Sequence, residues 1–469
     1  MGYPAQAASI ASKPTLTIDF VVIGGGIAGL CCAYALTRIG HRVVVLEQDN
    51  GLDQTKVSGG CRLPPNMSKI LFHWGLEQKV RDIAVTSGAT FLKIYETGYM
   101  LGTHEWDEEV LRETGGEFVF CHHVDLRRMM RELAEKAGAT IRYNTKVSFV
   151  DPESRSVRLS TGETVYGDVL IGADGPRGLC RRVVTGSSDL GPRTGLSLYS
   201  AMVSGERMRQ DPELAYFLQQ KHYTQAVWFG NGMCSISYPV VTTDKNFAMM
   251  IWAPDEDGDD ATWGEQAPAG RIQNFMGTCE PRLRKLAKIA PPPSRLPVYD
   301  VPDLEDWVHD DGPLLLVGEA AHTLLPGSIQ GSSMALEDAA VLAKLFSHLR
   351  SEDQIESFLY AFQDLRQKRC ATVRAQEMAN LHFMTMPPCA MQEARDRGMR
   401  AKYDAGLNVL TASDGETSAT WEEIKELFGY DAEDEADNWW VEWGLLRERA
   451  KERTMDFEMN IQVAEMVIN

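Results

Sequence analysis

A strand, a glycine turn, a helix and a second strand follow one another near the start of the chain. Residues 19–47 read DFVVIGGGIAGLCCAYALTRIGHRVVVLE, with glycines at 24, 26 and 29 and an acid, Glu47, after the second apolar run. Gly24 permits the tight turn, Gly26 lets a pyrophosphate approach the backbone, and Gly29 lets the helix pack on the strand. Glu47 follows Gly29 by 47 − 29 = 18 positions, close to the spacing at which an acid accepts ribose hydroxyls. This pattern predicts a Rossmann-like α/β fold that binds an adenosine with a free ribose, as in NAD or FAD, in preference to a purely structural glycine turn.

The composition narrows the class of protein. A chain of 469 residues is too long for one ordinary core, and its net charge of −19 argues against nucleic acid as a partner. The nine cysteines are scattered and include no C-x-x-C pair, so we expect no metal site, no disulfide framework and a reducing, cytoplasmic compartment. We find no signal peptide, and the uncharged run 20–36 is too short and too rich in glycine for a membrane span.

Two further segments place small residues and an acid after an apolar strand. Residues 168–182, DVLIGADGPRGLCRR, bring Asp174 and Gly175 into a turn. Residues 318–340, GEAAHTLLPGSIQGSSMALEDAA, follow an apolar run and enter a helix predicted over 332–345. The chain has no second G-x-G-x-x-G, so we predict no separate nicotinamide domain.

These three segments, in this order, resemble the signature of the group A flavoprotein monooxygenases, the family of para-hydroxybenzoate and salicylate hydroxylases. The resemblance covers residues 15 to about 375, and the sequence is most similar to that of the fungal salicylate-hydroxylase-like members. It implies FAD as the cofactor, NADH or NADPH as a transient co-substrate, and O2 as the oxidant. In that family the middle motif contacts the flavin or pyrophosphate, and the last motif lines the ribityl chain and the isoalloxazine ring.

Carried onto this chain, the resemblance implies specific contacts. Glu319 accepts from the ribityl hydroxyls, Pro326 lies beside the ring face where oxygen reacts, and Gln330 and Gly331 offer backbone donors to the pyrimidine edge of the flavin. The implied cofactor-binding set is Gly24, Gly26, Ile27, Ala28, Gly29, Glu47, Arg62, His123, Asp174, Gly175, Gly318, Glu319, Pro326, Gln330, Gly331 and Ser332.

The chain departs from the family pattern at four of its positions. Glu319 stands where Asp is usual, Thr323 replaces Pro, Ile329 replaces Gly, and His123 stands where an Arg commonly contacts the flavin or its phosphates. His122 and His123 suggest a base near the ring, or else a strand pair with one buried and one exposed face. By the resemblance, His322 is mainly structural.

Arg62 is the main candidate for substrate binding. It lies in residues 58–66, SGGCRLPPN, which resemble the family segment G-A-G-I-x-L-P-P-N, whose variable position points toward flavin and substrate. Ionising a phenol with a pKa of about 10 at pH 7 costs roughly 4 kcal/mol, which a base or a cation must supply. We predict that Arg62 holds a substrate carboxylate or phenolate; a flavin contact and an ordinary surface ion pair are the alternatives. The predicted catalytic residues are Arg62, Pro326 and Tyr238.

The domain order follows from the same patterns. We predict an FAD-binding domain from 15–193 and 301–375, an inserted antiparallel-sheet substrate domain over 194–300, and a helical C-terminal extension over 376–469. The aromatic residues that could line the inner face of the substrate domain are Tyr199, Tyr216, Tyr223, Trp228 and Tyr238. The acidic and aromatic stretch 431–443 is expected to pack over the FAD domain or a second subunit, with an active-site lid as the alternative.

Together these features predict an FAD-dependent monooxygenase that hydroxylates a small phenolic or aromatic-acid substrate. If Arg62 anchors a ring carboxylate, attack at the ipso carbon expels carbon dioxide, as with salicylate or a prenylated 4-hydroxybenzoate. Two alternatives remain open: an epoxidase or indole oxygenase of secondary metabolism, and a flavin-binding protein without oxygenase activity. A homodimer is compatible with the sequence.

Overall fold

A five-stranded parallel sheet forms the centre of the first of two structural parts. The computed structural model describes residues 14–51, 59–106, 111, 114–187, 189–220, 223–240, 246–255, 265–409 and 419–446. The strands lie in the order β17-β11-β1-β2-β7, and every neighbouring pair is parallel. Their bounds are β1 Asp19–Ile23, β2 Arg42–Leu46, β7 Thr140–Arg142, β11 Val169–Gly172 and β17 Leu314–Leu316. β11 and β17 are fully buried, as expected of parallel strands covered on both faces.

Helices and a small sheet complete this part. Helix α1 (Ile27–Ile39) packs against α5 (His123–Ala137) and α11 (Gly331–Phe346), and the long helix α12 (Gln354–Thr385) lies on α11. The predicted helix 332–345 is therefore present, with one more residue at each end. The smaller elements are α2 Pro65–His73, α3 Glu77–Ile83, α6 Leu179–Thr185 and a separate antiparallel sheet of β8 Val147–Asp151, β9 Ser156–Leu159 and β10 Thr164–Tyr166.

The second part is built on a nine-stranded sheet. Its order is β16-β12-β15-β14-β13-β4-β6-β3, with β5 paired to β4. The bounds are β3 Gly60–Leu63, β4 Ala84–Ile94, β5 Met100–Glu105, β6 Val119–His122, β12 Arg193–Val203, β13 Tyr223–Phe229, β14 Cys234–Val240, β15 Asn246–Pro254 and β16 Ser294–Tyr299. We predicted this sheet from 194–300 alone, but β3 to β6 join it from earlier in the chain, and β4 pairs with β13 in parallel. Long-range pairing of this kind leaves no local signal in the sequence.

The two faces of this sheet have different neighbours. Along β15, Ala248, Met250 and Trp252 belong to one buried cluster and Phe247, Met249 and Ile251 to another, because side chains alternate along a strand. The second cluster also holds residues of α7 (Gly205–Arg209), α8 (Pro212–Leu218), α9 (Arg271–Phe275) and α10 (Pro281–Ile289). The first cluster holds Leu325 of the last motif and Leu381 of α12, so this face is the one turned toward the FAD-binding segments.

This alternation separates the five aromatic candidates. Tyr238 lies in the cluster turned toward the last motif. Tyr199 and Trp228 are buried in the opposite cluster, under the helices. Tyr216 and Tyr223 are exposed. The expectation that all five line one inner face is therefore wrong for four of them, since the sequence alone does not fix the register of these strands.

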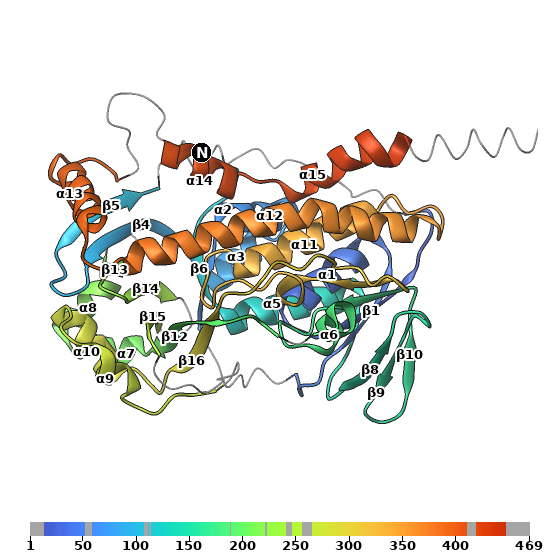
Figure 1. Cartoon of the computed structure of the whole chain (residues 1–469), viewed down its shortest axis with the longest axis horizontal. Coiled ribbons are helices and arrows are strands. Elements are labelled where there is room, and N and C mark those ends of the chain that lie inside the picture. The colour runs from blue at the N-terminus through green and yellow to red at the C-terminus, as the bar shows by residue number, and fades with distance from the viewer. Residues whose placement is uncertain are drawn as a thin grey trace, which may run out of the picture.

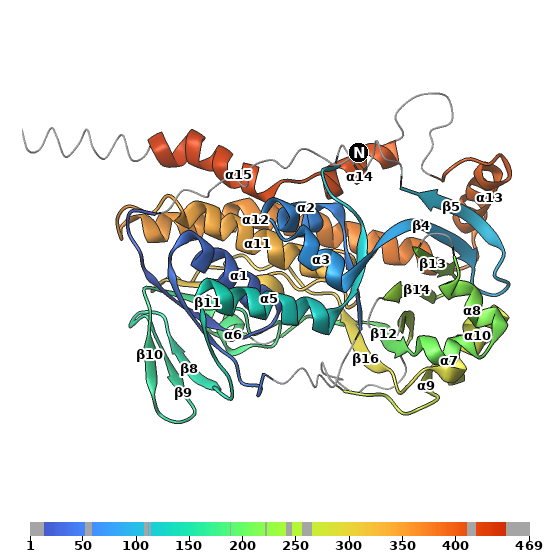
Figure 2. The ribbon, with the colours of Figure 1, turned by 180° about the vertical axis from the view of Figure 1, so that it is seen from behind.

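The C-terminal helices lie along both parts. α12 crosses the predicted boundary at residue 375 and contacts α11 as well as β13 and β14, so it spans the molecule (Figure 1 and Figure 2). α13 (Ala390–Asp404) contacts β5, α14 (Ala419–Phe428) contacts α2, and α15 (Ala432–Trp439) contacts α11. Trp440 stacks on His348 with the ring centroids 4.4 Å apart, so the acidic and aromatic stretch packs over the FAD-binding part, one of the arrangements predicted. None of the helices in the described ranges has the length and apolar character needed to cross a bilayer.

Candidate active site

The three motif segments meet at one edge of the parallel sheet. β1 leads into Gly24, β2 into Glu47, β11 into Asp174 and β17 into Gly318. The Gly24 N–H donates to Leu46 O at 2.9 Å, Ala173 N to Ile23 O at 2.8 Å and Val317 N to Gly172 O at 3.0 Å, so neighbouring segments are held edge to edge. Ligands of open α/β sheets bind at the carboxyl ends of the strands, where these residues gather.

The glycine turn leaves open space beside its backbone. Gly24 has φ +106°, and a Cβ there would lie 2.4 Å from Ala173 O; a Cβ on Gly29 would lie 2.0 Å from Gly24 O. A Cβ on Gly26, by contrast, would meet nothing within 4 Å. The same turn touches the last motif, because a Cβ on Gly318 would lie 2.5 Å from the Ala28 Cβ. Tight packing behind the turn and open space at Gly26, where helix α1 begins, fit a bound pyrophosphate.

Glu47 lies beside the turn, as the sequence predicted. Its carboxylate is buried and accepts from Gly25 N at 2.6 Å and from Asp49 N at 2.8 Å. Arg127, which the sequence analysis did not single out, donates to Gly25 O at 3.0 Å and lies 3.8 Å from the Glu47 carboxylate. A very small cavity lies beside this pair and is lined by Gly25, Leu30, Gly51, Arg127, Arg131, Ile141 and Tyr143.

Arg127 supplies the cation that His123 cannot. Burial is the main cause that lowers the pKa of His123 to about 4, and the charges of His122 and Arg127 lower it further, so the ring is neutral at pH 7. Burial also lowers the pKa of His122. Arg127 lies one helical turn after His123 on α5, on the same face of that helix. That i, i+4 spacing is the signal that could have found it.

Asp174 presents a carboxylate oxygen that the protein leaves unpaired. Its Oδ2 accepts from Cys180 N at 3.0 Å, while its buried Oδ1 has no hydrogen-bond partner among the described residues. Burial raises the pKa of this carboxyl above its usual value. Gly175 follows with φ +85° and open space where a Cβ would lie. A buried, unpaired oxygen at the ligand edge of the sheet is the feature expected of a cofactor contact.

The loop of the last motif is held from two sides. Glu319 lies in a short 3-10 turn (η1, Gly318–Ala320), and burial raises the pKa of its carboxyl. The N–H groups of Ile329 and Gln330 donate to Glu377 Oε1 of α12, at 3.1 and 3.2 Å. The Gln330 amide therefore points at this buried acid, not toward a flavin as the resemblance implied. Glu377 was missed because it lies far along the chain in an otherwise unremarkable helix.

The side chains of Gln330 and Ser332 contact other parts of the protein. Gln330 is fully buried, and its Oε1 accepts from Asn66 Nδ2 at 2.9 Å. The Ser332 hydroxyl lies 3.2 Å from the Cys61 sulfur at the start of α11. Cofactor contacts by Gly331 and Ser332, like the ring contact of Pro326, stay predictions.

Arg62 lies where the loop meets the second sheet. Only 4% of its surface is exposed, its Nη2 donates to Gly327 O at 2.5 Å, and its buried Nη1 has no partner among the described residues. Its burial contradicts the alternative of a surface ion pair, and the nearest acid in the described part of the chain is the buried Glu377, whose pKa burial raises and the charge of Arg62 lowers. A buried guanidinium with a free donor requires an anion or another acceptor.

Further polar groups without partners surround the same spot. The guanidinium lies 6.0 Å from the centre of the Tyr238 ring, and the buried Tyr238 hydroxyl, Ser328 Oγ and Trp252 Nε1 have no partners among the described residues. A Cβ on Gly327 would lie 3.0 Å from the Trp252 ring, so these groups converge around Gly327. Burial raises the pKa of Tyr238 above its usual value, so its hydroxyl is a hydrogen-bond donor at neutral pH and not a base.

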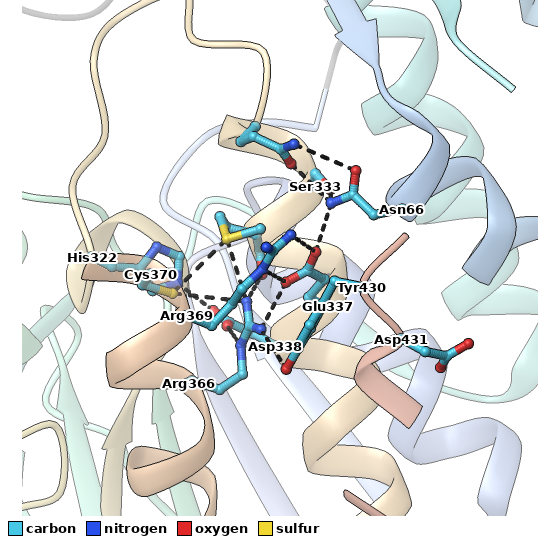
Figure 3. A network of polar contacts seen from close by, with 12 residues as sticks. Asn66, His322, Ser333, Glu337, Asp338, Arg366, Arg369, Cys370, Tyr430 and Asp431 are labelled. Atoms are coloured by element: carbon cyan, nitrogen blue, oxygen red, sulfur yellow. Dashed lines mark hydrogen bonds and ion pairs between the residues drawn. The ribbon is translucent and has the colours of Figure 1, made fainter. Parts of the chain in front are cut away.

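A buried network of charged side chains holds the loop of the last motif against α11 (Figure 3). Asp338 of α11 accepts from Gly318 N at 2.8 Å and pairs with His322 Nε2 at 2.6 Å, so it ties both ends of the GEAAH turn to the helix. Its other oxygen accepts from Arg366 Nε at 2.8 Å. Burial would raise the pKa of Asp338, but His322 and Arg366 lower it to about 2. Burial would likewise lower the pKa of His322, but Asp338 and Cys370 raise it well above its usual value, so the pair is ionic.

Glu337 extends the network to both flanking helices. Its carboxylate accepts from Asn66 Nδ2 at 2.6 Å, from Arg366 Nη1 at 2.7 Å and from Arg369 Nη2 at 3.2 Å. Arg369 also donates to Leu427 O at 2.7 Å, which attaches the C-terminal extension. His322, Asp338 and Cys370 offer ligand atoms within 4.8 Å of one another, but Arg366 and the charged His322 already balance the Asp338 charge. The structural role implied for His322 agrees with this arrangement.

Comparison with known proteins identifies the cofactor. A family model described as "FAD binding domain" matches residues 17–376. The chain belongs to this FAD-binding family. The match confirms FAD as the predicted cofactor and, with the relatives below, confirms the predicted resemblance to the group A flavoprotein monooxygenases.

The relatives extend over nearly the whole chain. The FAD-dependent monooxygenase OpS4 of Beauveria bassiana (strain ARSEF 2860) is 27% identical over 90% of this chain and 97% of its own. The 3-amino-4-hydroxybenzoate 2-monooxygenase PtmB3 of Streptomyces platensis is 26% identical over 81% of this chain and 91% of its own. The crystal structure of CtdE with FAD and substrate 4 has a TM-score of 0.75 at 18% identity, covering 92% of this chain and all of that one, which shows the shared fold.

The substitution Gly24→Ala is expected to abolish FAD binding, because its Cβ would collide with Ala173 O at 2.4 Å in the nucleotide turn. Gly40→Ala is the matched control, since Gly40 has φ +111° at the end of the same helix but open space around its Cβ position. It should cost about 1 kcal/mol of stability and keep the wild-type FAD content. The measurement is the FAD-to-protein ratio of each purified variant; equal ratios for both would contradict the proposed cradle.

The substitution Asp338→Asn is expected to lower the free energy of unfolding by about 3–5 kcal/mol at pH 7, because it leaves Arg366 and His322 buried without their anion. Since the pKa of Asp338 falls from its usual 3.8 to about 2 in the folded protein, its stabilisation is complete above pH 4 and is lost as the pH falls toward 2. Urea unfolding between pH 7 and 2 measures both effects. Asp437→Asn, in an exposed pair with Lys344 at 2.8 Å, should cost no more than about 1 kcal/mol.

Proposed function

We propose that this FAD-dependent monooxygenase uses NAD(P)H and O2 to hydroxylate a phenolic or aromatic-acid substrate that lies against Arg62. The observation that carries the proposal is the buried Nη1 of Arg62, which has no partner among the described residues. A guanidinium in this state favours a ligand with a carboxylate or a phenolate. An uncharged alkene or indole would leave that donor unpaired, which disfavours the epoxidase alternative.

The bound flavin would supply reduction by NAD(P)H and the activation of oxygen. The protein's own residues would prepare the aromatic ring. Arg62 would stabilise the phenolate or carboxylate, and the protonated Tyr238 hydroxyl would donate a second hydrogen bond to the same ligand. A cation contributes toward the roughly 4 kcal/mol needed to ionise a phenol at pH 7 because it stabilises the charged form.

The surroundings of this pair suit a flat, apolar ring. Apolar side chains make up much of the face of the sheet that carries Tyr238, with Leu198, Ile236 and Phe120 buried around it. Phe120 lies 4.7 Å from Tyr238 between ring centroids. Such a surface excludes water and strengthens the charge interaction with Arg62.

The relative named as a 3-amino-4-hydroxybenzoate 2-monooxygenase supports an aromatic acid as the substrate class. If the Arg62 guanidinium holds a carboxylate carried by the reacting ring carbon, hydroxylation at that carbon would release carbon dioxide. A salicylate or a prenylated 4-hydroxybenzoate would follow this course. The choice between NADH and NADPH, the cytoplasmic location and a homodimer stay predictions.

Substituting Arg62 by Met is expected to raise the dissociation constant of an aromatic-acid ligand about 100-fold, because a charge-assisted contact is worth about 2–3 kcal/mol. The FAD content should remain that of the wild type. Ligand titration followed by flavin fluorescence measures the dissociation constant. The ratio of flavin absorbance to protein absorbance measures the FAD content. Loss of FAD with unchanged ligand affinity would assign Arg62 to the flavin instead.

Tyr238→Phe offers a milder test with an internal control. It should raise the same dissociation constant about fivefold, since one neutral hydrogen bond is worth about 1 kcal/mol. Tyr199→Phe removes an equally buried and unpartnered hydroxyl from the opposite face of the same sheet and should leave ligand affinity unchanged. Equal effects from both variants would contradict the assignment of Tyr238 to the substrate face.

The reaction itself is tested by a substrate panel. Hydroxybenzoates, salicylate, their prenylated forms and uncharged indoles are compared for stimulated NAD(P)H and oxygen consumption, product mass and evolved carbon dioxide. We expect stimulation by ligands that carry an anion, with one carbon dioxide per product if the hydroxylated carbon bears the carboxylate. Stimulation by indoles alone would favour the epoxidase or indole oxygenase, and no oxygenated product with any ligand would indicate a flavin-binding protein without oxygenase activity.

A further inference from the structure

Two cysteines stand opposite each other on the strands that carry Arg62. β3 and β6 are antiparallel, and the register pairs Cys61 with Cys121. His123 N donates to Gly59 O at 3.0 Å in the same register, so 59 and 123 form a hydrogen-bonded pair and, two residues along, so do 61 and 121. Directly opposed residues of this kind have Cα atoms about 5.5 Å apart, which lies within the range that a disulfide spans.

The two thiols already interact. Cys61 and Cys121 stand directly opposite each other in the register, and Cys61 Sγ lies 3.2 Å from the Ser332 hydroxyl at the start of α11. Both cysteines belong to the core cluster of the FAD-binding part, whereas Phe120, the neighbour of Cys121, belongs to the cluster of the second sheet. Because side chains alternate along a strand, the thiols lie on one face of β3 and β6 while Arg62 points to the other.

The two thiols differ in access and in acidity. Both cysteines are buried, but Cys61 is 9% exposed and Cys121 0%, so Cys61 is the closer of the two to solvent. The neighbouring Cys121 side chain is the main cause that lowers the pKa of Cys61, against the effect of burial, and Ser332 and Arg62 lower it further. The pKa of Cys121 is raised well above its usual value by the same pairing and by burial. An acidic thiol beside a second thiol is the arrangement of an attacked and a resolving cysteine.

We propose that Cys61 and Cys121 are an oxidisable pair that closes to a disulfide when hydrogen peroxide reaches the active site. Peroxide takes the Cys61 sulfur to a sulfenic acid, and one water is released. The Cys121 sulfur then attacks the Cys61 sulfur, the S–S bond forms, and the sulfenic oxygen leaves as a second water. In sum, two thiols lose two electrons and two protons, and one peroxide becomes two waters.

The source of the peroxide rests on the proposed function. When a flavoprotein monooxygenase turns over without hydroxylating its substrate, NAD(P)H reduces O2 to hydrogen peroxide at the flavin. The pair would then report uncoupled turnover at the place where peroxide is made. Closing the disulfide removes the Cys61 thiol hydrogen and its contact with Ser332, where the flavin-binding helix begins, so oxidation should slow the enzyme.

The first test is chemical and does not require turnover. The FAD-loaded protein is treated with hydrogen peroxide, its remaining thiols are blocked at acidic pH, and it is digested with trypsin. Cleavage after Lys56 and Arg62 releases residues 57–62, and cleavage after Arg112 and Arg127 releases residues 113–127. We expect these two peptides to be joined, at a mass two hydrogens below their sum, and to separate on reduction.

Variants and an internal standard make the result decisive. In Cys121→Ser the sulfenic acid on Cys61 has no resolving thiol and should be trapped by dimedone. The exposed Cys389 serves as the standard, since it should oxidise without forming a link to either peptide. Oxidation of Cys389 with no joined peptide in the wild type, or dimedone labelling of Cys61 that is no greater in Cys121→Ser than in the wild type, would overturn the proposal.

The second test concerns the source of the peroxide and the effect of the disulfide on activity. Incubation with NAD(P)H and O2, without an aromatic substrate, should produce the same joined peptides, and catalase should prevent them. Oxidised wild-type enzyme should lose about tenfold in kcat/KM and recover with dithiothreitol, while Cys61→Ser, which has no sulfur to oxidise at this position, should show no such loss on the same treatment. If added peroxide joins the peptides but NAD(P)H with O2 does not, the proposed oxygenase chemistry is wrong and the disulfide proposal stands. If neither treatment joins them, the disulfide proposal is wrong.

Discussion

Two adjacent acids on α11, Glu337 and Asp338, are completely buried, and the structure around the flavin site depends on their pairing. Carboxylates in the interior are tolerated only with cations and hydrogen bonds around them. Asp338 has His322, Gly318 N and Arg366; Glu337 has Asn66, Arg366 and Arg369. The partners come from α2, the last motif and α12, so satisfying two charges on α11 places three other segments against this helix. The network holds the motif loop to α11 through contacts made by the protein alone.

The groups that would meet the substrate lie just beyond this network, where the charges are left unpaired. Arg62 has one nitrogen on Gly327 O and another with no partner among the described residues, and the Tyr238 hydroxyl beside it is unpartnered too. The same two strands carry the Cys61 and Cys121 thiols on their other face. This short antiparallel pair thus separates Arg62 on one face from the start of α11 on the other, and Cys61 is the immediate chain neighbour of Arg62.

Local motifs predicted the nucleotide end well, because its chemistry is encoded in consecutive residues. The glycines at 24, 26 and 29, Glu47 and Asp174 lie where their spacing implied. Arg127 and Glu377 were missed, since each acts through a contact to a backbone group about 50 to 100 positions away. Near residue 123 the cation is Arg127, one turn further along the same helix, whereas the Gln330 N–H donates to Glu377 of another helix, α12.

By itself, the sequence determined that the chain is an α/β flavoprotein with a three-part FAD cradle, because periodicity and glycine spacing are local properties of the chain. Only the tertiary structure decided which strands complete the second sheet, which face of it Tyr238 occupies, and that Arg62 is buried with a free donor. Those outcomes depend on pairing between β4 and β13 and on the charges that α12 brings to α11. Strand register and the compensation of buried charge are set by contacts between distant residues, which no local pattern records.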